Sequence, residues 1–262
     1  MPLAGVLAQQ RARSTGARTQ PLSPSHSQST PDLLAALPAF RTFTRPGGID
    51  FTLLSAASPA DLPPPTAAAL FQLTAQNKAP LYAASGFGWD PAAKARELRD
   101  EGARFLLAYE TKDVVAATTS AQPPLPLAAA PAAFVHYRLE MEGGVGTLYV
   151  YEIQLAPAVR RQGMGRFLMC ALELAARAGG LGQVMLTVQA GNAGAAALYE
   201  GLGFGTDPSS PGPRDGPGGR EPGYRIMSKQ LGGLVAKGAA AGVDGAVEVV
   251  SGGGAKKGEG GG

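Results

Sequence analysis

A short basic and glycine-rich segment, Arg160-Arg161-Gln162-Gly163-Met164-Gly165, has the residue types and spacing best suited to chemistry. Its glycines let the backbone turn without Cβ clashes and approach a ligand closely. The segment precedes an apolar helical pattern, and the free N–H groups at the start of a helix attract anions. With the charge of the arginines, these features predict a phosphate site. For these six residues alone, an ordinary loop with two solvated arginines is the alternative.

The stretch before this loop, residues 147–155, is the strongest strand candidate in the chain. Its side chains alternate with a period of two, which indicates a β-strand with two different faces. The alternation is expected to place Leu148, Val150 and Glu152 on one face, and Tyr149, Tyr151 and Ile153 on the other.

The remaining elements follow from periodicity, capping residues and proline positions. After the loop, residues 165–178 have helical spacing and end at Gly179 and Gly180. The proline-rich stretches 121–131 and 208–223 are expected to be loops. The order predicts an α/β sandwich, a mixed central sheet flanked by helices. Further helices are expected at 31–37, 63–76, after Trp89 with Asp90 as cap, and 194–202, and further strands at 104–118, 134–139, 184–188, 203–206 and 224–229.

Composition limits the folded unit to one domain, residues 32–230. Residues 1–31 are rich in Ser, Thr, Arg, Gln and Pro and contain no acidic residue, so we expect a disordered tail. The same composition also suits an organelle transit peptide, and that alternative stays open. Residues 231–262 are dominated by Gly and Ala and are expected to be a second disordered tail.

Several function classes are disfavoured. Cys170 is the only cysteine and there are two histidines, so neither an internal disulfide nor a zinc cluster is expected. Apolar stretches fall short of the roughly 20 residues that span a bilayer. Outside residues 1–31, basic and acidic side chains are equal in number, which disfavours direct binding to nucleic acid.

The loop 160–165 and a group of residues from 192 to 204 resemble two motifs of one enzyme family. Arg-x-x-Gly-x-Gly between a strand and an apolar helix resembles the acetyl-CoA pyrophosphate motif of GNAT acetyltransferases. Asn192, Leu198, Tyr199 and the run Gly201-Leu-Gly-Phe204 resemble the second signature of that family. The resemblance implies the GNAT fold, acetyl-CoA as cosubstrate and no metal. The residues it implies for acetyl-CoA are Ile153, Gln154, Leu155, Arg160, Arg161, Gln162, Gly163, Met164, Gly165, Arg166 and Asn192.

Residues 81–229 further resemble the NatD enzymes, which acetylate the N-terminal amine of histone 4 and histone 2A tails beginning Ser-Gly-Arg-Gly. The similar blocks are residues 134–140, 149–155, 184–188 and 222–229. Phe87, where that family usually has tryptophan, and the prolines near residue 125 are departures. The resemblance implies a monomer in the nucleus and cytoplasm that binds histone N-terminal tails, without direct nucleic-acid or membrane partners.

The expected chemistry is deprotonation of an amine followed by attack on a thioester. An α-amine has an ordinary pKa of about 7.7 to 8.0, so a modest base suffices. We expect Glu152 to be this base, acting through a water, and Tyr224 to steady or protonate the leaving thiolate. A salt bridge at a strand edge is the alternative for Glu152, and core packing is the alternative for Tyr224. Tyr199 is left open between the thiol and packing.

The acceptor groove needs a carboxylate, because carboxylates bind guanidinium groups bidentately. Glu140 is the candidate for reading an arginine, with Glu142 in support, and His136 and Trp89 are expected to be structural. An enzyme acetylating lysine side chains or a small amine, and a CoA-binding regulator without turnover, are the competing functions. The residues implied for the substrate are Tyr82, Glu140, Tyr151, Thr187, Ser209 and Tyr224.

Overall fold

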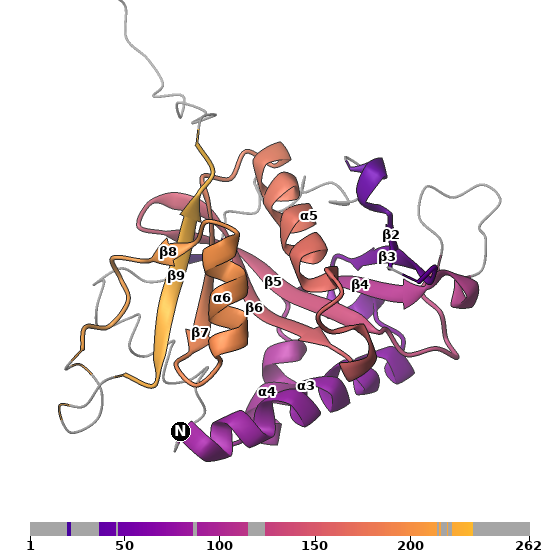
Figure 1. The fold of residues 1–262 in the computed structure, drawn as a ribbon, viewed down its shortest axis with the longest axis horizontal. Coiled ribbons are helices and arrows are strands. Elements are labelled where there is room, and N and C mark those ends of the chain that lie inside the picture. Colours follow the sequence, from indigo (N-terminus) through magenta and orange to yellow (C-terminus); the bar gives the residue numbers. More distant parts are fainter. Residues whose placement is uncertain are drawn as a thin grey trace, which may run out of the picture.

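The fold is one twisted sheet with helices on both faces (Figure 1). The computed structural model describes residues 20–21, 37–45, 47–85, 88–114, 124–213, 215, 219 and 222–232. Its strands are β1 (Gln20–Pro21), β2 (Thr42–Thr44), β3 (Asp50–Ala56), β4 (Arg104–Glu110), β5 (Ala133–Glu142), β6 (Val145–Leu155), β7 (Gln183–Gln189), β8 (Gly205–Thr206) and β9 (Tyr224–Gln230). Its α-helices are α3 (Pro64–Ser85), α4 (Pro91–Leu98), α5 (Met164–Ala178) and α6 (Ala193–Gly201).

The sheet is mixed, as expected from the sequence. The order along it is β2-β3-β4-β5-β6-β7-β9-β8, and β1 pairs with β5. Neighbours from β2 to β6 are antiparallel, β6 and β7 are parallel, and β7, β9 and β8 are again antiparallel. The parallel pair requires a crossover, which the loop after β6 and helix α5 supply.

Alternate residues of β4 separate two hydrophobic cores. Leu106 and Ala108 belong to the core under α5 and α6, where Leu168 and Tyr199 also lie. Phe105, Leu107 and Tyr109 belong to the core under α3 and α4. The central strands are therefore covered on both faces, with α5 and α6 opposite α3 and α4.

The helices begin where their capping residues predict. In α4, Asp90 Oδ1 accepts a hydrogen bond from the Ala93 N–H at 2.8 Å, and Pro91 is the first helical residue. Helix α5 begins after Gly163, whose φ of 91° lies in the left-handed region that favours glycine. The start of α4 was expected from the sequence, and α5 begins one residue before Gly165, where its helix was expected.

Several boundaries differ from expectation. Strands β2 and β3 were not predicted, because β3 is buried at Phe51, Leu53 and Leu54 and shows no clean polar alternation. Helix α3 continues past Gln76 to Ser85 with Pro80 inside it. Strand β4 ends at Glu110, where a 3₁₀ turn begins, rather than near residue 118. Of the helix expected at 31–37, residues 31–36 lie outside the described residues, and Leu37 is not in a helix.

The ends of the chain add one pairing. Gln20 and Pro21, inside the stretch expected to be disordered, lie opposite Met141 and Glu140 of β5 in antiparallel register.

In the described part of the chain, none of the helices is long and apolar enough to cross a membrane. Those same residues hold no group of three or more side chains suited to a metal ion.

Candidate active site

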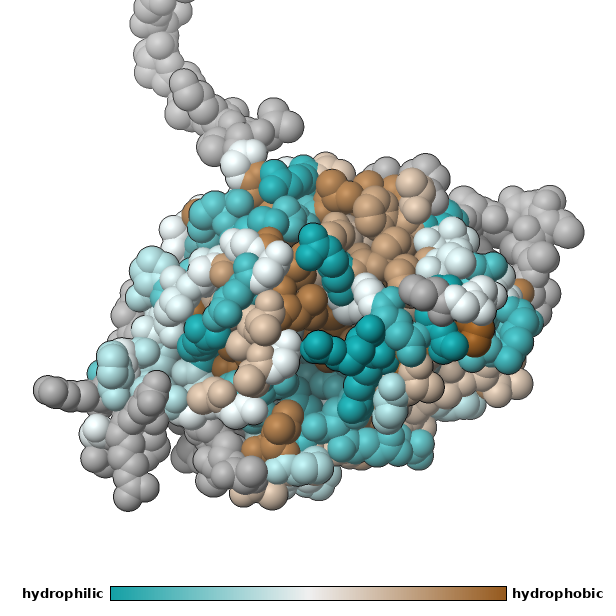
Figure 2. Space-filling model, viewed as in Figure 1, coloured by the Kyte–Doolittle hydropathy of each residue, from teal (hydrophilic) through white to brown (hydrophobic). Residues whose placement is uncertain are grey.

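The site lies where two neighbouring parallel strands separate. Strands β6 and β7 pair from Thr147 to Val150, and the pairing ends at Val150 with Leu186. Beyond this point the strand ends enclose a cavity of about 900 Å³, lined also by α3, the loop 160–166 and α6. Figure 2 shows the corresponding hollow in the face of the molecule, with hydrophilic side chains around an apolar floor. Strand ends that do not pair leave backbone groups available to a ligand.

A β-bulge in β6 decides which way its polar side chains point. His136 of β5 pairs with Glu152, but Tyr137 pairs with Val150, so Tyr151 is the extra residue. The bulge places Tyr151 and Glu152 on the same face, the one covered by α3 and α4. The expectation that Glu152 shares a face with Leu148 and Val150 is therefore wrong, because strict alternation holds only where no residue is inserted.

The glycine-rich loop has the backbone of an anion site. Arg161, at φ 59°, and Gly163, at φ 91°, are both left-handed. The first helical hydrogen bond of α5 runs from the Phe167 N–H to the Gly163 carbonyl, so the preceding N–H groups have no partner within the helix. A Cβ on Gly165 would lie 3.3 Å from Leu198, so a larger residue would require that side chain to shift. The loop thus offers N–H groups and positive charge to a phosphate.

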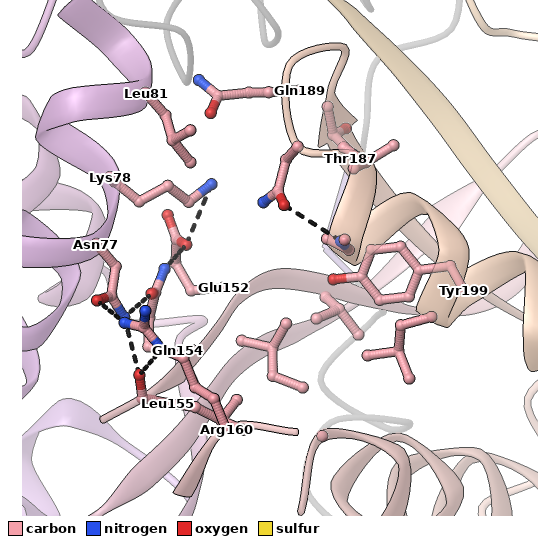
Figure 3. A pocket seen from close by; sticks show the side chains of 18 of the residues that line it. Asn77, Lys78, Leu81, Glu152, Gln154, Leu155, Arg160, Thr187, Gln189 and Tyr199 are labelled. Carbon is pink, nitrogen blue, oxygen red and sulfur yellow. Dashed lines mark hydrogen bonds and ion pairs between the residues drawn. The ribbon is translucent and has the colours of Figure 1, made fainter. Parts of the chain in front are cut away.

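Arg160 is held beside this loop by an amide that the sequence did not single out. Its guanidinium donates to the Leu155 carbonyl at 3.1 Å and to Asn77 Oδ1 at 2.5 Å. The Asn77 amide in turn donates to Gln154 Oε1 at 2.9 Å and to the Leu155 carbonyl at 3.2 Å (Figure 3). Asn77 therefore ties α3 to the end of β6, beyond its last pairing with β7.

Glu152 is the centre of a buried ion network. Its carboxylate lies 2.7 Å from Lys94 Nζ and 3.4 Å from Lys78 Nζ, and accepts from the Gln154 amide at 2.6 Å. Lys94 also contacts Glu97 at 2.6 Å. The network joins β6 to α3 and α4, and Figure 3 shows Lys78 pointing across the cavity wall to Glu152.

The network fixes the charge of Glu152. Burial alone raises the pKa of this carboxyl, but the ammonium groups of Lys78 and Lys94 outweigh it and lower the pKa from 4.5 to about 2. The neighbouring carboxylates raise the pKa of Lys94 despite its burial. Glu152 is thus a carboxylate throughout the physiological pH range, and a weaker base than an ordinary glutamate.

His136 lies away from the cavity. Its ring is fully buried and stacks between Phe105 and Tyr151, with ring centres 5.3 and 5.1 Å away. Desolvation lowers its pKa well below the usual value, so the ring is neutral. This setting agrees with a structural role.

The expected acceptor residues gather beside the bulge. The Tyr151 hydroxyl donates a hydrogen bond to Glu140 Oε1 at 2.6 Å. The Arg138 guanidinium lies over the Tyr151 ring, with its Cζ 4.5 Å from the ring centre. The hydroxyls of Tyr149 and Thr187 are 2.5 Å apart. Around them Tyr82, Tyr149, Met185, Tyr224 and Ile226 form a buried cluster, against which Trp89 and Tyr151 pack.

The cavity brings most of the expected residues together. Tyr199, left open from the sequence, lines it as well, and its burial raises its pKa, so the phenol keeps its proton. Asn77, Lys78 and Gln189 line it without having been predicted. The expected residues that line it are Tyr151, Glu152, Ile153, Gln154, Leu155, Arg160, Arg161, Gly163, Gly165, Arg166, Thr187 and Asn192.

Other expected residues do not line the cavity. The Gln162 amide donates to the Ala158 carbonyl, and the Met164 side chain is buried in the core. Ser209 is bound to Asp207 through both its N–H and its hydroxyl. Tyr82, Glu140 and Tyr224 lie in or beside the aromatic cluster and outside the cavity lining.

Comparison with known proteins identifies the family. The family model for the acetyltransferase (GNAT) family matches residues 75–204, and the chain belongs to this family. Its sheet and flanking helices have the GNAT fold.

Three solved structures illustrate the similarity. Nourseothricin acetyltransferase is 26% identical over 50% of this chain and 66% of its own length, with a TM-score of 0.37. Ribosomal-protein-S18-alanine N-acetyltransferase from Escherichia coli is 22% identical over 71% of this chain and 97% of its own length, with a TM-score of 0.45. Spermidine N-acetyltransferase from Vibrio cholerae, in complex with CoA and spermine, is 17% identical over 69% of this chain and 95% of its own length, with a TM-score of 0.45.

Proposed function

We propose that this protein transfers the acetyl group of acetyl-CoA to the N-terminal α-amine of peptides that begin Ser-Gly-Arg-Gly, as in histone 4 and histone 2A. The observation that carries the proposal is the cavity between β6 and β7. It joins the glycine-rich loop at one end to a buried carboxylate at the other. The loop suits the anionic phosphates of the acetyl donor, and the carboxylate suits the cationic amine of the acceptor. The two substrates can therefore lie next to each other in one cavity.

The residues present fit acetyl-CoA. The N–H groups at the start of α5, with Arg161 and Arg166, suit the pyrophosphate. The backbone of Ile153 to Leu155 pairs with β5 on one side and has no partner strand on the side of β7. That open side suits the amide groups of the pantetheine arm, which can pair with it as an added strand. Bound acetyl-CoA would supply a thioester for acyl transfer. Tyr199 lines the same cavity and retains its phenolic proton, so its hydroxyl can donate a hydrogen bond to the sulfur there.

Glu152 is suited to holding the substrate's ammonium group. Direct transfer of a proton from an α-amine of pKa about 8 to a carboxylate of pKa about 2 is unfavourable by roughly 8 kcal/mol. At pH 7.4 roughly a quarter of such an amine is already unprotonated. Glu152 therefore attracts and orients the amine, and the proton leaves through water. This role needs less basicity than the sequence argument assumed.

The acceptor side supports a peptide with an arginine near its N-terminus. Glu140 is 6% exposed and bonded to Tyr151, which itself lines the cavity, so its carboxylate lies one side chain away from the reaction site. A guanidinium reaching this carboxylate would gain a charge-assisted hydrogen bond. The resemblance of residues 81–229 to the NatD enzymes supports the same substrate.

The test is a peptide panel analysed by mass spectrometry. Each sequence is offered with a free and a blocked N-terminus, in versions with Ser-Gly-Arg-Gly, Ser-Gly-Ala-Gly and an internal lysine. We expect acetylation of free Ser-Gly-Arg-Gly amines and little on blocked peptides. Faster acetylation of internal lysines, or of a small polyamine, would replace this proposal with the corresponding acceptor.

A further inference from the structure

Lys78 places a primary amine inside the cavity assigned to acetyl transfer. Among the described residues that line the cavity, it is the only lysine. Its Nζ lies 3.4 Å from Glu152 Oε2 and 5.8 Å from the centre of the Tyr82 ring. The amine therefore occupies the position beside Glu152 that an acceptor ammonium would need.

The surroundings distinguish Lys78 from the other lysine of the network. Lys94 Nζ is held between two carboxylates, at 2.6 and 2.7 Å, and its side chain is 7% exposed. Lys78 has one longer ion pair, is 18% exposed and faces the cavity. A flexible four-carbon stem allows its amine to move along the cavity wall while α3 stays in place.

We propose that Lys78 is an internal acetyl acceptor, so that the protein acetylates itself at this residue when acetyl-CoA is bound. The inference rests on the proposed function, because the same cavity must hold the donor. In the reaction, Lys78 Nζ forms a bond to the carbonyl carbon of the thioester and the carbon–sulfur bond breaks. The ammonium loses two protons, of which one ends on the CoA thiol and the other is released to water.

Self-acetylation would change the site that performs it. The acetylated side chain is neutral, so Glu152 would keep Lys94 as its cation and lose Lys78. The charge of Lys78 lowers the pKa of Glu152 more than the charge of Lys94 does. Acetylation of Lys78 would therefore raise the pKa of Glu152. The modified protein would then have a more basic carboxylate beside the acceptor amine.

The experiment uses the full chain incubated with acetyl-CoA, then digested and mapped for a mass gain of one acetyl group at each lysine. Lys112, which is 74% exposed and paired with Glu110, reports spontaneous acetylation in the same sample. We expect Lys78 to be modified at least about tenfold faster than Lys112, since the amine is held beside the donor. The rate constant should not depend on protein concentration, and should rise with pH because only an unprotonated amine attacks.

Two variants and one parallel assay separate the possible failures. Gly163→Glu should lower Lys78 modification to the Lys112 level, and Lys78→Arg should remove the modified peptide. Peptide acetylation is measured alongside. If Ser-Gly-Arg-Gly peptide is acetylated while Lys78 stays at the Lys112 level, the inference is wrong and the proposed function stands. If neither is acetylated, both fall. A first-order rate constant that rises with protein concentration would also overturn an internal acceptor.

Discussion

Removing the buried ammonium of Lys94 should destabilise the protein strongly at neutral pH. Lys94→Met keeps the apolar stem of the side chain without the ammonium group, and leaves Glu97 and Glu152 buried, with Lys78 as the remaining cation beside Glu152. Breaking a buried ion pair by removing one partner costs about 3 to 5 kcal/mol. The pKa of Glu152 is lowered by Lys78 as well as by Lys94, so only part of that shift is lost with Lys94.

The assay is urea unfolding followed by circular dichroism, at pH 7.5 and pH 4.5. The depressed pKa of Glu152 contributes stability that is present above its ordinary value of 4.5 and is lost as the pH falls toward 2. In the variant, the two carboxylates that have lost Lys94 take up protons at higher pH, so the difference in the free energy of unfolding from wild type should narrow at pH 4.5.

The matched control is Lys112→Met, which removes an equally short ion pair, 2.6 Å, on the surface. Exposed pairs contribute little, so this variant should unfold like wild type. Equal stability of the Lys94 and Lys112 variants at pH 7.5 would refute the reasoning that the buried network supports the fold.

Four further predictions concern binding and turnover. Gly163→Glu should abolish acetyl-CoA binding in calorimetry while circular dichroism stays native; unchanged affinity would remove the loop from the site. Glu140→Gln should lower kcat/KM for Ser-Gly-Arg-Gly peptide about ten- to a hundredfold, and should have no further effect on a peptide with alanine in place of arginine. Glu152→Gln should raise KM for the peptide and also lower kcat, because Glu152 both attracts and orients the amine; unchanged kcat and KM in the folded variant would contradict its place beside the amine. A chain of residues 32–230 should keep its activity in the peptide assay, and loss of turnover in that folded chain would show that the tails take part.

The sequence was sufficient where local rules decide the structure. The cap at Asp90, the helix after the loop and the strand before it follow from residue type and spacing. Strand β3 was missed because it is buried on both faces, so its sequence lacks alternation. Helix α3 was underestimated at its C-terminal end, beyond Gln76.

The candidate site was predictable in part. The loop and the end of β6 lie near each other in sequence and carry a recognisable pattern. Asn77, Lys78 and Lys94 reach the site from helices α3 and α4, which are far from it along the chain. In the sequence, each of these polar residues is typical of the exposed face of a helix. The bulge at Tyr151 depends on pairing with β5, so alternation within β6 could not reveal it.

The central claim is that one cavity holds acetyl-CoA and a peptide N-terminus together. The most direct measurement is calorimetric binding of two conjugates, in which an acetyl bridge joins the CoA sulfur to a peptide amine. One carries the bridge on the α-amine of Ser-Gly-Arg-Gly, the other on a lysine side chain of an N-terminally blocked peptide without arginine. We predict that the α-linked conjugate binds about ten- to a hundredfold more tightly, as expected for one added charge-assisted hydrogen bond. Equal or tighter binding of the lysine-linked conjugate would contradict the account.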